Sequence, residues 1–179
     1  KEIQLSIKRN HIINEFLNQS VNLIVKHCIK NDIGTVIVGD FEGAKDGINH
    51  GRKNNQNFVS VPYYKFKAKL ESKCQQYGIQ YKAVNESYTS KCDALALEPV
   101  KKHESYLGRR KKRGLFQSST GVLLNADVNG ALNIIRKVSG DSPVKEIISS
   151  GLVNRPVTVY LCGNKLNCVS SYSASPILA

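Results

Sequence analysis

Two acidic residues of this 179-residue chain stand at the edges of apolar segments, where they could take part in metal chemistry. Glu86 follows the apolar run 79–84, and Asp127 lies near the start of the segment 125–134. Hydrolysis of a phosphodiester by two metal ions needs several carboxylates within about 4 Å of the metals, because Mg²⁺ prefers oxygen ligands. A carboxylate at a strand end and another at a helix start suit such a site. By spacing alone, Asp127 could equally cap a helix and Glu86 could be a plain surface residue.

The charge of the chain favours a polyanionic partner. Lys and Arg number 26 against 14 Asp and Glu, which gives a formal net charge of +12. Such an excess binds polyanions by neutralising phosphates and releasing counterions. The segment 101–113 concentrates seven of the cations: Lys101, Lys102, Arg109, Arg110, Lys111, Lys112 and Arg113. A run of this kind can be a solvated surface, but beside a nuclease-like centre we expect it to contact nucleic-acid phosphates.

The segments that position these residues alternate between helix and strand. Apolar residues recur at three- and four-residue spacing over 12–29, which predicts an amphipathic helix. The β-branched run 34–39 predicts a buried strand, and the polar, glycine-rich segment 40–57 predicts a loop. A second helix is predicted over 62–78, with proline in its first turn and glycine after its last, and a second strand over 79–84. This alternation is typical of an α/β sheet with crossover helices.

The segment 88–124 has a different character. Five consecutive cations, a Ser-Ser-Thr-Gly turn and a short apolar run predict a small hairpin. We expect its apolar residues to pack together or onto the main sheet: Leu95, Leu97, Leu115, Phe116 and Val122. A third helix is predicted over 126–138, with one apolar side formed by Val128, Ala131, Leu132 and Ile135. Beyond Ser139 we expect a loosely ordered tail with one short helix over 144–149.

Two stretches resemble motifs of a known family. Residues 125–134 read Asn-Ala-Asp-Val-Asn-Gly-Ala-Leu-Asn-Ile, and residues 86–91 read Glu-Ser-Tyr-Thr-Ser-Lys. Together they resemble the C-terminal part of the RuvC-like nuclease of transposon-encoded OrfB (TnpB) proteins, which are relatives of the type V CRISPR effectors. The first stretch resembles the third acidic motif of that family, and the second resembles the segment that enters its zinc-ribbon insert. The resemblance covers residues 1–138.

The resemblance implies a fold of the α/β class, a partial ribonuclease H-like (RuvC-like) domain with a degenerate zinc-ribbon-like β-hairpin insert. Residues 1–87 would form part of the RuvC-like core, 88–124 the insert, 125–138 the closing helix of the core, and 139–179 the tail. The implied function is that of the C-terminal part of an RNA-guided DNA endonuclease encoded by an insertion sequence. Guide RNA and target DNA would be the partners, and Glu86 and Asp127 would be catalytic ligands of Mg²⁺.

The chain departs from the family pattern at the second acidic residue. Many relatives carry a Glu-Asp pair at the end of the earlier strand, where this chain has Gly39-Asp40. Relatives with this glycine carry the glutamate on the neighbouring strand, which here is Glu86. Adjacent strand ends can offer carboxylates to the same metal, and Asp40 remains a lesser candidate.

A second departure concerns zinc. A ribbon needs two Cys-x-x-Cys pairs to build a tetrahedral thiolate site. Cys92 stands where the first pair would begin, but residue 95 is Leu and the segment 117–120 contains no Cys. Cys92 and His103 cannot complete a site by themselves, so we predict no zinc.

The first acidic residue of a RuvC-like centre belongs to an opening strand in an Asp-x-Gly context, and no such motif precedes the first predicted helix. The chain contains no Met and opens directly into a helical pattern, which predicts a piece of a longer protein whose N-terminal remainder is a partner of this piece. We therefore expect this chain alone to be inactive as an endonuclease. Five scattered Cys without an apolar targeting segment predict reduced thiols and a cytoplasmic location, and no apolar run is long enough to span a membrane.

A second hypothesis is a non-catalytic nucleic-acid-binding protein, either a decayed or a nuclease-dead transposase relative. An Asp-x-Gly strand upstream of Lys1 would favour the enzyme, and its absence would favour the binder. A third hypothesis is a generic basic RNA-binding domain, which would leave Glu86 and Asp127 far apart.

Overall fold

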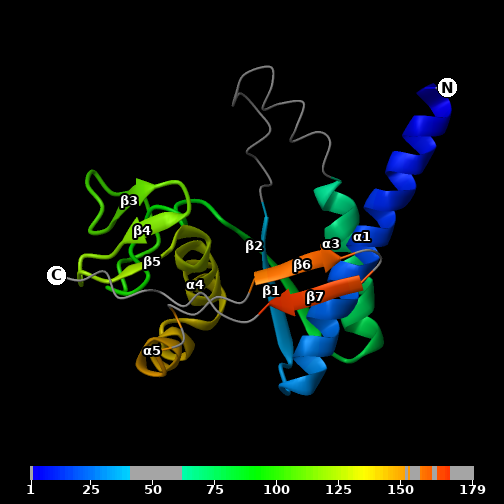
Figure 1. Ribbon diagram of the computed structural model, residues 1–179. Coiled ribbons are helices and arrows are strands. Elements are labelled where there is room, and N and C mark those ends of the chain that lie inside the picture. The colour runs from blue at the N-terminus through cyan, green and yellow to red at the C-terminus, as the bar shows by residue number, and fades with distance from the viewer. Residues whose placement is uncertain (1, 41–61, 152, 154–157, 163–164, 170–179) are drawn as a thin grey trace. The chain divides into compact units, whose positions relative to one another are not determined.

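The computed structural model describes residues 2–40, 62–151, 153, 158–162 and 165–169, which form a mixed α/β structure (Figure 1). Most of the predicted loop 40–57 lies outside these residues. The chain divides into two compact units. Unit 1 contains the described parts of residues 1–36, 44–82 and 159–169, and unit 2 contains the described parts of 37–43 and 83–158.

Unit 1 is built around two helices, α1 (Glu2–Lys30) and α3 (Tyr63–Gln76), which lie side by side (Figure 1). The buried residues of each helix follow helical spacing: Leu17, Val21, Val25 and Cys28 on α1, and Leu70 and Cys74 on α3. Both predicted helices are thus confirmed, although α1 begins ten residues earlier than the predicted segment 12–29. Gly78 has a φ of +68°, the left-handed conformation expected just after the end of α3.

Strands β1 (Thr35–Asp40) and β2 (Gln80–Asn85) pair in a two-stranded sheet. The amide of Gln80 donates to the carbonyl of Gly34, and the amide of Glu86 donates to that of Asp40. Both bonds join residues at the same sequence offset, so the two strands run in the same direction and end together. The boundary between the units falls inside both strands, and the strand ends belong to unit 2.

Unit 2 contains a three-stranded antiparallel sheet of β3 (Arg109–Lys112), β4 (Leu115–Gln117) and β5 (Leu123–Asn125), in that order. The predicted hairpin is therefore extended by a third strand. Helices α4 (Ala126–Ser139) and α5 (Ser142–Ser149) follow directly. One buried cluster joins this sheet to both helices: Ala94, Phe116, Leu124, Ala126, Leu132, Val144 and Val153.

The packing of residues 88–124, which we call the insert, agrees only in part with the expectation. Phe116 belongs to the buried cluster, and Leu95 and Leu97 pack against it. Leu115 and Val122 are only partly buried and lie outside this cluster. The partners of the insert are α4 and α5, because the apolar faces of these helices need a cover that the short strands supply.

The segment after Ser139 contains the predicted short helix, α5, and two strands that the sequence pattern did not indicate, β6 (Thr158–Cys162) and β7 (Lys165–Val169). These strands pair with each other. No helix of the described residues is both long and apolar enough to cross a membrane.

Candidate functional site

The Glu86 side chain occupies the space above Gly39, at the point where β1 and β2 end. A Cβ atom added to Gly39 would overlap Oε2 of Glu86 and would lie 3.0 Å from both Cδ of Glu86 and Cδ1 of Ile134. Gly39 is itself buried. Because any larger residue here would displace the carboxylate, the glycine in β1 and the glutamate after β2 are complementary parts of one arrangement.

The environment of Glu86 favours a nearby cation. Burial raises the pKa of the Glu86 carboxyl most, the negative charge of Asp40 raises it further, and the positive charge of Lys137 lowers it. Oε1 of Glu86 is buried and has no hydrogen-bond partner within the described part of the chain. A buried carboxylate oxygen without a partner is costly, and a divalent cation is the kind of group that relieves this cost. The buried carboxylate oxygen of Glu86, which also experiences the negative charge of Asp40, therefore fits a hard metal ion.

Asp127 lies in the first turn of α4, and its carboxylate is not the cap of that helix. The N-cap is Asn125, whose Oδ1 accepts hydrogen bonds from the amides of Asp127 at 2.7 Å and Val128 at 3.3 Å. Asp127 is exposed, and no hydrogen bond or ion pair within the described residues engages its carboxylate. The helix is therefore capped by Asn125 and not by Asp127. The carboxylate of Asp127 is available to another partner.

Helix α4 connects the two candidate residues. Ile134 reaches Gly39 beside the Glu86 carboxylate. Asp127 precedes Ile134 by seven residues, which places both on one face of the helix at a separation of about 10 Å along its axis. Among the described residues, no three His, Cys, Asp or Glu side chains are grouped closely enough to hold a metal ion. The structure thus offers Glu86 and Asp40 together, with Asp127 on the adjoining helix face.

The buried side of α4 includes three of the four predicted apolar residues, since Leu132 belongs to the core cluster and Val128 and Ile135 pack against it, but it also carries polar residues that were not predicted. Ala131 is exposed, whereas Asn129, Asn133 and Arg136 are buried together with Leu132. Asn129 donates to the carbonyl of Cys92 and accepts from the amide of Ala94, and Asn133 donates to the carbonyls of Thr89 and Cys92. Arg136 donates to the carbonyl of Glu98 and to Asn133, and it pairs with Asp141 at 2.6 Å. The sequence signal was present, because these polar residues recur at helical spacing along α4, but apolar periodicity alone does not detect it.

The first loop of the insert is closed by the carboxylate of Asp93, which is fully buried. Oδ2 accepts from the hydroxyl of Ser118 at 2.9 Å, and from the amide and hydroxyl of Ser119 at 2.7 and 2.9 Å. Oδ1 accepts from the amides of Leu95 and Ala96 at 3.2 and 3.3 Å. We call these five bonds the Asp93 hub. The hub joins the two loops where the family pattern would place its Cys pairs.

Cys92 lies next to this hub as a buried free thiol. Its Sγ donates to the carbonyl of Lys101 at 3.5 Å, and burial is the main cause that raises the pKa of the thiol. A thiol held protonated in this way is a poor metal ligand. His103 contacts the carbonyl of Pro99 at 2.8 Å through Nε2, so its ring is also engaged elsewhere.

The basic residues of the insert are accessible. All four residues of β3 are exposed, as are Arg113, Lys101 and Lys102. Beside β3 a polar groove of about 320 Å³ is lined by Leu107, Arg109, Gln117, Ser118 and Ser119. Cations on an exposed strand next to a polar groove suit contact with a phosphate backbone.

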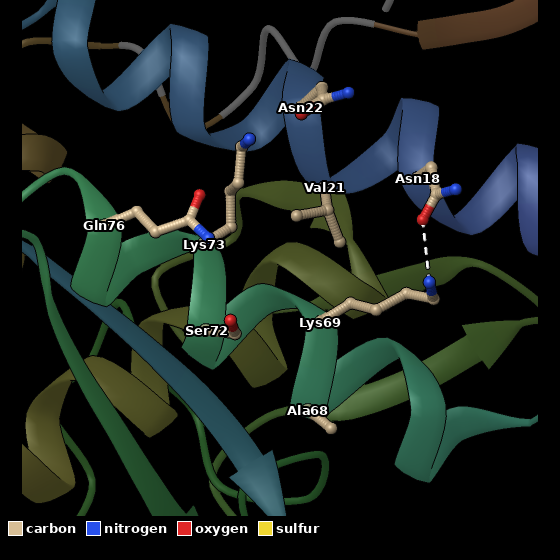
Figure 2. Close-up of a pocket in the computed structure, with 8 residues that line it drawn as sticks. All are labelled: Asn18, Val21, Asn22, Ala68, Lys69, Ser72, Lys73 and Gln76. Carbon is tan, nitrogen blue, oxygen red and sulfur yellow. Dashed lines mark hydrogen bonds between the residues drawn. The ribbon is translucent and has the colours of Figure 1, made fainter.

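A second groove, of about 450 Å³, lies in unit 1 between α1 and α3 (Figure 2). It is lined by Asn18, Val21, Asn22, Ala68, Lys69, Ser72, Lys73 and Gln76. Nζ of Lys69 donates to Oδ1 of Asn18 at 2.8 Å across the groove, as Figure 2 shows. None of these eight described residues carries a carboxylate, so this groove is not a candidate for the metal.

Comparisons with known proteins found a family model, curated relatives and solved structures to which this chain is similar. Residues 63–134 match the family described as the Cas12f1-like TNB domain. The CRISPR-associated endodeoxyribonuclease Cas12f1 of Syntrophomonas palmitatica is 24% identical over 184 residues, covering 89% of this chain and 36% of that protein. The TnpB-like protein ORF457 of Acidianus two-tailed virus is 34% identical over 91 residues, covering 50% of this chain and 18% of that protein. A cryo-EM structure of a Cas12f1–sgRNA–target DNA complex superposes with a TM-score of 0.56 and 28% identity, covering 74% of this chain and 36% of that chain.

The fold is of the mixed α/β class and includes a small three-stranded sheet in unit 2. The chain is related to the TnpB and Cas12f1 proteins, as the two sequence motifs predicted. It spans about a third of the length of the Cas12f1 relative and about a fifth of the length of ORF457.

Proposed function

We propose that this chain is the C-terminal part of an RNA-guided DNA endonuclease and that Glu86 and Asp127 are ligands of its catalytic Mg²⁺. Asp40, at the end of the paired strand, remains a lesser candidate ligand. The observation that carries the proposal is the buried Oε1 of Glu86, which lies beside Asp40 and has no hydrogen-bond partner among the described residues. We further propose that the Glu86 and Asp127 carboxylates approach each other to on the order of 4–8 Å, the range in which they can share metal ions.

Each residue of this site has a defined task. Glu86 presents a carboxylate oxygen to which no described residue donates a hydrogen bond, and Gly39 leaves the room for it. Asp127 presents its carboxylate from a helix start whose amides are already capped by Asn125, and the helix dipole favours a negative charge there. Bound Mg²⁺ would stabilise the charge that develops on the phosphate during cleavage of the phosphodiester bond.

The proposed partners are a guide RNA and a target DNA. The Cas12f1 structure that this chain resembles is a complex with sgRNA and target DNA, and the exposed cations of the insert supply positive charge for phosphates. The residues proposed for this contact are Lys101, Lys102, Arg109, Arg110, Lys111, Lys112 and Arg113.

The proposal extends to the fold. The parallel ends of β1 and β2 with α4 beside them suit the core of a ribonuclease H-like domain, and the insert suits a ribbon that is held by the Asp93 hub instead of zinc. On this proposal residues 1–87 and 125–138 form the core, 88–124 the insert and 139–179 the tail.

The test is Mn²⁺ binding to the chain, followed by paramagnetic broadening of its amide NMR signals. We expect Mn²⁺ to broaden signals around Glu86 and Asp127 at the same concentrations. Replacing either carboxylate with Ala should weaken the affinity by about tenfold or more, since few ligands remain. Gly39→Ala should weaken it similarly, because the new methyl group displaces Glu86. Glu71→Ala, in an exposed position on α3, is the control.

The result also separates this proposal from its alternative, a non-catalytic nucleic-acid-binding protein. The chain should bind nucleic acid without cutting it, because two or three carboxylates hold catalytic metal weakly. If Mn²⁺ broadened the signals around Asp127 equally in the wild type and in Glu86→Ala, the two carboxylates would not share a site. Salt-sensitive nucleic-acid binding with no Mn²⁺ effect at either residue would favour the non-catalytic binder.

A further inference from the structure

Glu86 lies in a tight turn, residues 85–89, which we call the Glu86 turn. Tyr88 in this turn has a φ of +67°, a left-handed conformation that is costly for a residue other than glycine. The amide and hydroxyl of Thr89 both donate to the carbonyl of Glu86, at 3.2 and 2.8 Å. Oδ1 of Asn85 accepts from the amide of Ser87 at 2.8 Å. A strained turn persists only when its surroundings hold it, so the contacts around it are informative.

Two residues of α4 hold the Glu86 turn from outside. Nζ of Lys137 donates to the carbonyl of Asn85 at 2.7 Å and to that of Ser87 at 2.9 Å. These carbonyls belong to the residues immediately before and after Glu86. One turn earlier on the helix, Asn133 donates to the carbonyl of Thr89 at 2.9 Å. The Lys137 bonds are charge-assisted and short, which makes them strong for their type.

Lys137 holds the main chain without bonding Oε1 of the carboxylate. Its positive charge acts on Glu86, yet its Nζ donates to two carbonyl groups, and Oε1 of Glu86 has no hydrogen-bond partner in the described part of the chain. A lysine bonded directly to that oxygen would compete with a cation for it. The observed arrangement orients Glu86 and keeps the oxygen available.

We propose that Lys137 is a positioning residue, which holds the Glu86 carboxylate above Gly39 and fixes it relative to the helix that carries Asp127. The role of Glu86 as a metal ligand rests on the proposed function, whereas its position above Gly39 does not. Lys137 and Asp127 are ten residues apart on α4, about 15 Å along the axis. Helix α4 therefore carries both a residue that holds the Glu86 turn and the proposed ligand Asp127.

The experiment measures the position of Glu86 directly by NMR on the whole chain. In the wild type we expect nuclear Overhauser effects between the Hα protons of Gly39 and the side chain of Glu86, because these groups are in contact. Lys137→Met keeps the length of the side chain but removes its donors, so these signals should be lost while the other signals of α4 persist. Lys137→Arg should restore them. Lys145→Met, in an exposed position on α5, is the matched control.

The Mn²⁺ titration gives a second readout. Lys137→Met should weaken Mn²⁺ binding by about tenfold, as loss of a group that orients a ligand does, and Lys137→Arg should recover most of it. If Lys137→Met unfolds the chain, Lys137→Gln provides a second comparison, because its side chain is uncharged and shorter than that of Lys137.

The outcomes separate the two proposals. Contacts between Gly39 and Glu86 that persist in folded Lys137→Met or Lys137→Gln would overturn the positioning role. Contacts that depend on Lys137 in a chain that binds no Mn²⁺ would uphold the positioning role and overturn the proposed metal site.

Discussion

Glu86 illustrates what can be predicted for a single residue. Its place at the end of a strand and the motif around it made it a candidate metal ligand. The motif also related Glu86 to the glycine of β1, but the physical reason appears only in the structure, where the carboxylate lies in the space that a Cβ of residue 39 would occupy. The raised pKa likewise depends on burial and on Asp40, which is 46 residues away in the chain. Neither the burial nor the approach of a distant charge is encoded in local spacing.

Replacing this carboxyl with an amide should stabilise the chain at neutral pH. Because the folded-state pKa of Glu86 lies above the usual value of 4.5, the folded chain holds more protons than the unfolded chain between these two values. Stability is therefore lost as the pH rises through that window. Glu86→Gln removes this loss, so its midpoint of thermal unfolding should exceed that of the wild type at pH 7 and match it near pH 3.

Thermal unfolding followed by circular dichroism at both pH values tests this expectation, with Glu71→Gln as a control for the change in charge. Adding Mg²⁺ should raise the midpoint of the wild type and leave that of Glu86→Gln unchanged, since only the folded wild type has the complete site. A lower midpoint for Glu86→Gln at pH 7 would contradict the electrostatic account.

At the scale of elements, periodicity predicted where α1, α3, α4, β1 and β2 lie better than it predicted which faces they bury. Phe16, one of the apolar residues that recur over 12–29, is 43% exposed, and Ala131, which was placed on the apolar side of the third helix, is exposed. Leu132, Val128 and Ile135 of α4 do pack in or against the core, but the helix also buries amides and a guanidinium whose partners lie in the insert. Such polar faces are stable only because of bonds to residues more than 30 positions away, which a local pattern does not contain.

The insert should depend on the Asp93 hub for its stability. Asp93→Ala removes an acceptor of five hydrogen bonds and leaves buried donors near Ser118 without a partner. Because a buried donor without a partner is costly, we expect the free energy of unfolding to fall by at least about 2 kcal/mol.

Urea unfolding of Asp93→Ala tests this expectation. Glu104→Ala, an exposed acidic residue of the same insert, should change the stability by less than about 0.5 kcal/mol. Equal stability of Asp93→Ala and the wild type would show that the hub is dispensable. One zinc per chain in elemental analysis would contradict the prediction that the insert holds no zinc.

For the whole molecule, composition predicted a polyanionic partner, and the structure adds where the positive charge is exposed. β3 and Arg113 carry five consecutive accessible cations, Arg109 to Arg113. Composition alone does not distinguish binding through a particular surface from general attraction by the net charge of +12. A charge-matched comparison makes this distinction.

Neutralising all five residues of this run to Gln should weaken binding to DNA and RNA of any sequence. The slope of log affinity against log salt should become shallower by up to about 0.9 for each phosphate that the variant no longer neutralises. The matched control removes five exposed cations elsewhere: Lys8, Arg9, Lys26, Lys30 and Lys145. Fluorescence anisotropy over a range of salt concentrations measures both. Equal decreases in affinity for the two variants would mean that net charge, and no particular surface, binds the nucleic acid.

Closure of the insert by oxygen and nitrogen atoms has a practical consequence. A ribbon held by zinc-bound thiolates unfolds when EDTA removes the metal or when peroxide oxidises the sulfur atoms. Binding of nucleic acid by such a ribbon is then lost at the same time as catalysis. The hydrogen bonds of the Asp93 hub contain no metal for EDTA to remove and no sulfur for peroxide to oxidise. EDTA should therefore abolish only what depends on the hard cation, and binding of nucleic acid by this chain should be unchanged in its presence.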